Sequence, residues 1–192
     1  VMLGMGAGDT AVRLMGKRPA RIAEQEQVLG VIRGLLAGDA LEVGAQRPAK
    51  LRHASAADVW VAAGGPKTLE MAGRAADGVF IRVGTHSGNI ERSLAAVRRG
   101  AESVRRDPDS IGYALIFHTI VCDDPERRLA VARSMAAGYL EYSPMLMEPT
   151  GWTWDGPPLH ELQTQVWPDF HHARDLAAAG ARLAFIPEQV AG

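Results

Sequence analysis

The stretch Ala62-Ala63-Gly64-Gly65-Pro66-Lys67 consists mostly of small residues and follows the apolar run 59–61. Its backbone could bind an anion. The run is predicted to be a strand, and a helix is predicted to begin directly after the bend. The free N–H groups and the positive dipole end of such a helix point toward the space after the strand, which suits a phosphate. A tight strand–helix turn without a ligand explains the same residues, and Lys67 would then only face water.

A second glycine-rich stretch, Gly4-Met5-Gly6-Ala7-Gly8-Asp9, matches a dinucleotide-binding fingerprint only in part. That fingerprint needs G-x-G-x-x-G opening directly into a helix. Here the third glycine comes one position early, and the next helix is expected only near Pro19. A glycine-rich turn that lets a strand end sharply is the alternative. The G-x-x-x-x-G-K-[ST] phosphate loop does not occur in the sequence.

Other reactive side chains give no catalytic pattern. None of the six histidines has a partner at i, i+4 with an attendant carboxylate, so no metal site is predicted. His118 lies in an apolar run and is expected in the core. The single cysteine, Cys122, is expected to be a buried thiol on a strand. A G-x-S-x-G motif is absent, and no catalytic residue is named.

Composition and charge narrow the class of protein. The chain has 192 residues, 47% of them hydrophobic, so it can bury a sizeable core. Its 21 basic and 22 acidic side chains are interspersed, which argues against nucleic acid or an anionic membrane as a partner. No apolar run is long enough to cross a bilayer and no signal peptide opens the chain, so a cytoplasmic protein is expected.

Strands and helices are predicted to alternate along the chain. The expected strands lie at 1–5, 59–61, 79–83 and 111–121, and the expected helices at 19–36, 68–76, 90–104, 124–142 and 169–179. Repeated strand–helix alternation predicts an α/β fold with a parallel sheet. The strands show little polar alternation, which predicts that both faces of the sheet are covered.

Residues 143–167 lack this alternation and are rich in Pro, Gly, Trp and Met. We expect an ordered excursion, because Trp152, Trp154 and Trp167 can pin a loop to the body of the protein by burying their rings. A contact with substrate is the alternative for these aromatic side chains.

Taken in order, these stretches resemble the luciferase-like family of flavin-dependent oxidoreductases. The similarity is closest to the branch that uses a deazaflavin coenzyme, typified by methylenetetrahydromethanopterin reductase. It runs from Val1 to about Asp124, more loosely to Gly192, and the order and spacing of short motifs make it specific. The residues that carry it are Gly4 to Val12, Lys17-Arg18-Pro19-Ala20, Val61 to Glu70, Ala72-Gly73 and Ala76-Asp77-Gly78-Val79.

The resemblance implies a (β/α)8 TIM barrel with the cofactor at the C-terminal ends of the strands. The cofactor would be a deazaflavin coenzyme of the F-420 type or FMN, used for hydride transfer or monooxygenation of a small organic substrate. The residues implied to bind it are Ala62, Ala63, Gly64 and Gly65 at the phosphate region, Ile81 and Val83 along the same pocket, and Gly6 and Gly8 at its border.

The number of predicted strands, four or five, is smaller than the eight of a complete barrel, which typically has ~250 residues. We therefore expect residues 1–192 to be the C-terminal part of a single barrel domain, incomplete because its N-terminal strands, with the catalytic residues, precede Val1. The full-length protein is expected to be a homo-oligomer. A truncated remnant that keeps only a phosphate cradle is one alternative. A barrel isomerase or aldolase is another, although the predicted strands contain no lysine for an aldolase.

Overall fold

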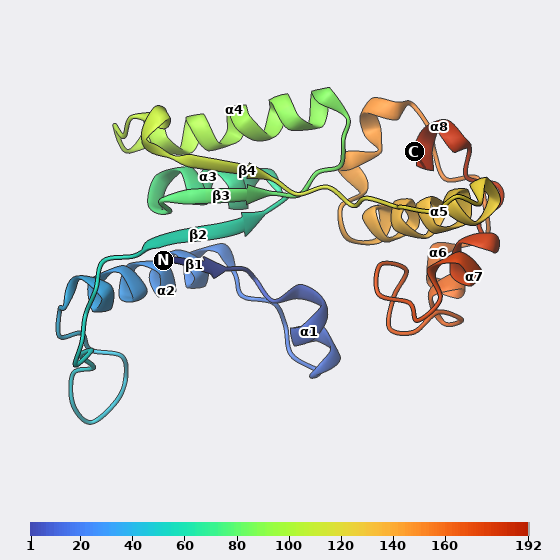
Figure 1. The fold of residues 1–192 in the computed structure, drawn as a ribbon. Helices are drawn as coiled ribbons and strands as arrows, with labels where there is room; N and C mark the ends of the chain where they lie inside the picture. Colours follow the sequence, from blue (N-terminus) through green and yellow to red (C-terminus); the bar gives the residue numbers. More distant parts are fainter. Residues whose placement is uncertain (192) are drawn as a thin grey trace. The chain divides into compact units, whose positions relative to one another are not determined.

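The computed structural model describes residues 1–191, which form two compact units divided between Ile116 and Phe117. We name them the sheet unit (1–116) and the helical unit (117–191), and Figure 1 shows the elements of each. The single barrel domain expected across the whole chain stays a prediction.

Four parallel strands build the sheet unit and follow the chain order across the sheet. Strand β1 (Met2–Met5) pairs with β2 (Asp58–Ala63), β2 with β3 (Gly78–Ile81), and β3 with β4 (Gly112–Leu115). The predicted α/β fold with a parallel sheet is confirmed. The predicted strand 111–121 was too long, because β4 ends at Leu115 and residues 116–122 have no regular structure.

Four helices and a short 3-10 turn connect the strands. They are α1 (Asp9–Leu14), α2 (Ile22–Ala37), α3 (Pro66–Ala75), α4 (Ser87–Ser103) and η1 (Pro108–Ser110). Pro66 occupies the first turn of α3, where the missing N–H of proline costs nothing. Helix α1 was not predicted, since its six residues are too few to show a helical period.

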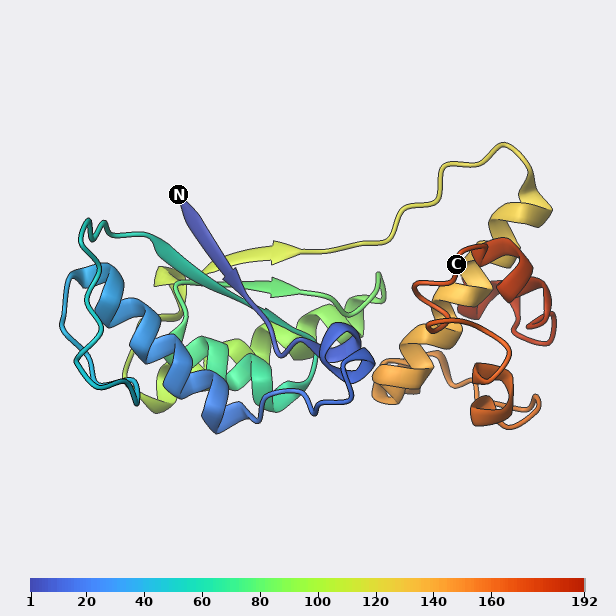
Figure 2. The same ribbon diagram turned by 90° about the horizontal axis from the view of Figure 1, so that it is seen from below.

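The helices α2, α3 and α4 lie on one side of the sheet, as Figure 2 shows. On that side Val59, Val61 and Val79 are fully buried. The alternate residues Trp60 and Phe80 point to the opposite face and are only half-buried, with ring centroids 5.0 Å apart. Among the described residues of the sheet unit, the predicted cover is therefore present on one face only.

Trp60 lies across the bare face of the sheet. A Cβ at Gly78 on β3 or at Gly112 on β4 would overlap its indole ring. Because neither glycine has a side chain, the indole ring can lie against the backbone of β3 and β4. A large aromatic side chain thus covers backbone that no helix of this unit covers.

Close backbone contact joins α3 to α4. A Cβ at Gly73 would overlap the carbonyl group of Val97, and one at Gly100 would overlap the carbonyl group of Glu70. Gly73 belongs to α3 and Gly100 to α4, so each helix contributes one glycine to the contact. This packing leaves α3 little freedom to shift along or away from α4.

The helical unit consists of one long helix and several short turns. They are α5 (Pro125–Tyr142), η2 (Pro144–Leu146), η3 (Glu148–Thr150), α6 (Leu159–Gln163), α7 (Leu176–Ala181) and α8 (Glu188–Ala191). The side chain of Asp124 caps α5 by accepting hydrogen bonds from the N–H groups of Glu126 and Arg127. Within residues 1–191, no helix combines the length and the apolar character needed to span a bilayer.

The excursion at 143–167 is ordered into these short helical turns. Trp152 and Trp154 pack against a core that includes Phe170 and Leu183, which agrees with a pinning role. Trp167 does not follow that prediction, since it is 76% exposed. The predicted helix at 169–179 was also wrong at its start: the carboxylate of Asp175 caps α7, so the helix begins at Leu176.

We predict opposite effects of the same substitution at two helical glycines. Gly100→Ala should lower the free energy of unfolding by about 1–3 kcal/mol, because the added methyl group overlaps the backbone of α3. Gly30→Ala on α2 should instead raise it by up to about 1 kcal/mol, because a Cβ there meets nothing within 4 Å and alanine favours the helix. Urea unfolding of both variants measures the difference. Equal effects would show that α3 and α4 are not in backbone contact.

We also predict that a polypeptide of these 192 residues self-associates in isolation. The bare face presents Trp60 and Phe80, and both edge strands have unpaired backbone groups. Sedimentation velocity over a range of concentrations measures the association. Ala114→Lys, which adds a charge to the bare face beside Phe80, should reduce it. A monodisperse monomer that melts cooperatively would contradict the prediction.

Candidate functional site

The carboxyl ends of all four strands lie on the same edge of the sheet, because the strands are parallel. Loops that contain glycine follow three of them: Gly6–Gly8 after β1, Gly64–Gly65 after β2, and 82–86 after β3. Ligands of parallel α/β proteins bind beyond this edge. The predicted cofactor residues that lie in loops therefore gather where such a ligand is expected.

The Gly64–Gly65 bend leads directly into α3. Gly65 is the N-cap of the helix, and its carbonyl oxygen accepts a hydrogen bond of 3.0 Å from the N–H of Leu69. The N–H groups of Lys67 and Thr68 precede the first residue that can bond within the helix. They and the positive end of the dipole of this ten-residue helix are directed at the space after β2.

The two glycines of this bend differ in the space around them. A Cβ at Gly65 would have no atom within 4 Å, so the backbone there borders open space. A Cβ at Gly64 would lie 3.1 Å from the carbonyl oxygen of Arg82. The N–H of Arg82 in turn donates to the carbonyl oxygen of Ala63 over 3.3 Å. The bend is thus packed against the end of β3 on one side and accessible to a ligand on the other.

Gly6 and Ala62 are brought together at this edge. A Cβ at Gly6 would lie 3.7 Å from the Cβ of Ala62, and Ala62 is exposed. Gly8 serves the turn itself: its φ is +72°, and a Cβ there would lie 2.6 Å from Cγ2 of Val12. A residue other than glycine at position 8 would therefore be strained on both counts.

The side chains of Ile81 and Val83 lie on the opposite face from the bare surface. They are 1% and 2% exposed, on the face covered by the helices, and Ala63 is also buried there. These residues can reach a ligand at the carboxyl edge only through their main-chain atoms. Their assignment to a cofactor pocket, like that of the glycines, stays a prediction.

A shallow cavity of about 500 Å³ lies in the connection that follows β1. The carboxylate of Glu24 accepts hydrogen bonds from Arg18 at 2.6 and 2.9 Å and from the N–H of Arg21 at 2.7 Å. The bond from Arg18, followed by that from Arg21, lowers the pKa of Glu24 to about 2. The residues that line the cavity are Ala7, Val12, Lys17, Arg18, Ala20 and Glu24.

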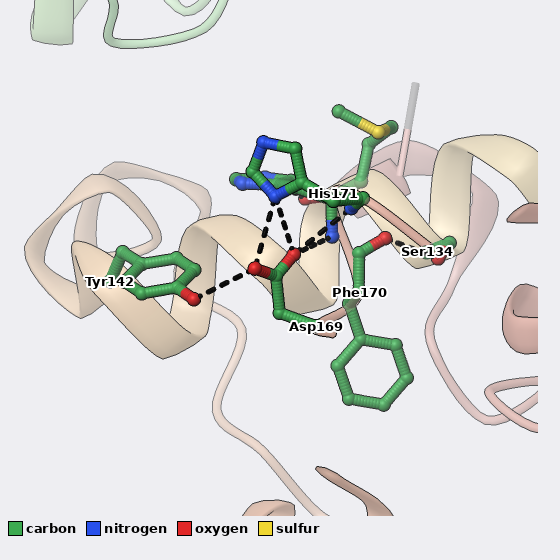
Figure 3. Close-up of polar contacts among 7 residues, drawn as sticks. Ser134, Tyr142, Asp169, Phe170 and His171 are labelled. Carbon is green, nitrogen blue, oxygen red and sulfur yellow. Dashed lines mark hydrogen bonds and ion pairs between the residues drawn. The ribbon is translucent and has the colours of Figure 1, made fainter. Parts of the chain in front are cut away.

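The helical unit contains a second polar cluster, centred on Asp169 (Figure 3). The carboxylate of Asp169 is almost fully buried and accepts hydrogen bonds from the N–H groups of His171 and His172, both at 2.9 Å. The hydroxyl group of Tyr142 on α5 donates to it over 3.0 Å, and Nδ1 of His172 lies 2.8 Å from it. Four donors thus converge on one side chain.

Burial raises the pKa of the Asp169 carboxyl, but the hydrogen bonds from His172 and Tyr142 together outweigh burial and leave the pKa below its ordinary value. Because a carboxylate only accepts, Nδ1 of His172 carries the proton and Nε2 is the nitrogen left for other partners. The hydroxyl group of Ser134 also donates to the carbonyl oxygen of Phe170 over 2.8 Å. The cluster ties the 169–172 turn to α5.

Sequence reasoning missed this cluster, although Asp169 and His172 stand at i and i+3. It also misplaced two side chains of the same unit. His118, expected in the core, is exposed, and its Nδ1 lies 3.2 Å from the hydroxyl oxygen of Tyr139. Cys122 is half-buried and lies outside any strand. Among the side chains that the structure describes, no three of His, Cys, Asp or Glu are grouped as a metal ion would need.

We predict that Asp169→Asn lowers the free energy of unfolding by about 1–3 kcal/mol at neutral pH, because the amide cannot accept all four hydrogen bonds. The pKa of Asp169 is lower in the folded chain, so its contribution is complete above the ordinary value of 3.8 and is lost as the pH falls through the folded value. Urea unfolding at several pH values should therefore show the two proteins converging in acid. Asp155→Asn, at an exposed aspartate of the same unit, is the control and should change stability by less than about 0.5 kcal/mol. A difference that persists unchanged in acid would contradict an ionised Asp169.

Comparison with known proteins supports the resemblance drawn from the sequence. The chain is 27% identical over 162 residues to 5,10-methylenetetrahydromethanopterin reductase of Methanolobus tindarius, covering 78% of this chain and 48% of that protein. It is 31% identical over 151 residues to F420-dependent glucose-6-phosphate dehydrogenase of Mycolicibacterium fortuitum, covering 71% of this chain and 45% of that protein. The chain thus spans about half the length of these relatives.

The fold is also that of solved enzymes. The coenzyme F420-dependent tetrahydromethanopterin reductase of Methanopyrus kandleri matches 99% of this chain and 59% of its own with a TM-score of 0.65, at 20% identity. This likeness confirms the TIM-barrel type of fold, of which the four strands form a part. The model of the luciferase-like monooxygenase family matches residues 1–188. The chain therefore belongs to the luciferase-like monooxygenase family.

Proposed function

We propose that the protein containing this chain is an oxidoreductase that uses a deazaflavin coenzyme of the F420 type to move a hydride to or from a small organic substrate. The observation that carries the proposal is the open bend at Gly65, where amides of α3 meet the end of β2. Relatives that are F420-dependent by name support this cofactor over FMN. Hydride transfer is proposed over monooxygenation because these relatives are a reductase and a dehydrogenase by name.

The bend fits the phosphate of such a coenzyme. A phosphate needs several N–H donors and a backbone that it can approach closely. Lys67 and Thr68 offer main-chain N–H groups, and Gly65 leaves the approach open. Ala62 and Gly6 widen the same space, because neither carries a side chain beyond Cβ. The coenzyme would supply the hydride-accepting ring, and this chain would bind and orient it.

The cofactor residues in this proposal are those that the family resemblance implies, with roles adapted to where the structure places them. Gly64 and Gly65 would hold the phosphate, with Ala62 and Gly6 beside it. Ala63, Ile81 and Val83 would contribute main-chain atoms at the same edge, since their side chains are buried. Gly8 would contribute by shaping the neighbouring turn.

We predict that Gly65→Asp abolishes cofactor binding without unfolding the protein. Aspartate is a favourable N-cap residue at this extended backbone position, so the melting temperature should stay the same or rise. Its carboxylate would occupy the phosphate position and repel the phosphate, so the Kd for the coenzyme should rise at least about tenfold, the equivalent of 1.4 kcal/mol. Gly65→Asn is the matched control, which adds similar bulk without the charge and should weaken binding less.

The measurement is a fluorescence titration with coenzyme F420 and, separately, with FMN. Turnover would be followed by the loss of the absorbance of the oxidised deazaflavin when a reduced substrate is added. Retention of neither compound by the unmodified protein would rule out the proposed function. An unchanged Kd in Gly65→Asp would rule out this position for the phosphate while leaving the cofactor itself in place.

A further inference from the structure

The motif Lys17-Arg18-Pro19-Ala20 has no part in the phosphate site, yet it borders the cavity after β1. The cavity also includes Ala7, in the turn whose Gly6 lies against Ala62. The N–H of Ala20 donates to the carbonyl oxygen of Ala7 over 3.4 Å, which ties the motif to that turn. The cavity and the Gly64–Gly65 bend therefore follow neighbouring strands along one edge of the same unit.

The two cations of this motif differ in what surrounds them. Arg18 forms a two-point ion pair with Glu24, which also accepts the N–H of Arg21, so its charge is compensated. Lys17 is exposed and has no ion pair or side-chain hydrogen bond among the side chains that the structure describes. Among the side chains that the structure describes around the cavity, Lys17 is thus the one cation without an acidic partner, and a positive charge favours an anionic group over a neutral one.

We propose that Lys17 binds a carboxylate of the deazaflavin coenzyme that lies beyond its phosphate, in the cavity after β1. The inference rests on the proposed function, which places the phosphate at the neighbouring bend. A chain attached to that phosphate and continuing along the edge of the sheet toward β1 would meet Lys17. FMN ends at its phosphate, whereas coenzyme F420 continues into a carboxylated tail, so Lys17 would distinguish the two cofactors.

Two anchors on one ligand predict a specific pattern of affinity. The phosphate at the Gly64–Gly65 bend is common to tailed and tail-less forms, and the contact with Lys17 is available only to the tailed form. Joining the two contacts makes the second one intramolecular, so it adds to affinity without a further association step. Because Lys17 is exposed, its contribution should weaken as salt screens the charges.

The test uses the unmodified protein and three variants, titrated with coenzyme F420 and with the same deazaflavin shortened to its ribityl phosphate. Lys17→Gln should raise the Kd for the tailed coenzyme about three- to tenfold and leave the shortened form unchanged. Lys17→Arg should keep the affinity for the tailed form. Lys50→Gln, at an exposed lysine that does not line the cavity, should change neither Kd. The effect of Lys17→Gln should shrink between about 0.05 and 0.5 M salt.

Each other outcome overturns the inference in a distinguishable way. Equal losses for both forms would place Lys17 at the phosphate. Unchanged binding of both forms would remove Lys17 from the cofactor site. Unchanged cofactor binding with a raised KM would assign the cavity to an anionic substrate. Binding of neither form by the unmodified protein would refute the proposed function, and this inference with it.

Discussion

The position of the candidate site depends on the backbone contact between α3 and α4. Because Gly73 and Gly100 have no side chains, the two helices approach until their main chains touch, which gives α3 a single place against the sheet. In that place its first turn, with the N–H groups of Lys67 and Thr68, is directed beyond the end of β2. A candidate site built from main-chain amides depends on where a helix points, so Gly73 and Gly100 contribute to it although neither belongs to it.

The two faces of the sheet differ in how they are packed. One face buries Val59, Val61 and Val79 under the helices and supplies the hydrophobic stabilisation of the unit. On the other face Trp60 lies over two glycines, and Ala62, toward the carboxyl end of β2, is paired with Phe80 on β3. At the carboxyl edge of this face, Gly6 and Ala62 lie together and are exposed.

The net charge of −1 does not reveal how charged side chains are arranged locally in this chain. Arg18 and Glu24 neutralise each other beside Lys17, so one cation of a two-residue basic motif is structural while the other faces the cavity. In the helical unit, Asp169 is buried yet ionised because donors from α5 and from its own turn converge on it. Both arrangements use hydrogen bonds to hold a charged side chain in place.

The sequence by itself determined the parallel α/β fold, the helices α3, α4 and α5, the strand–bend–helix unit at Gly64–Gly65 and, through the order of its motifs, the family. These features are encoded by residues close in the chain, through periodicity, capping and turn chemistry. Only the tertiary structure decided that Ile81 and Val83 turn toward the helices, that β4 ends early, and that Asp169 lies at the centre of a turn instead of in a helix. Those outcomes depend on which distant segment packs on which face and which distant donor reaches a side chain, and no local pattern contains that information.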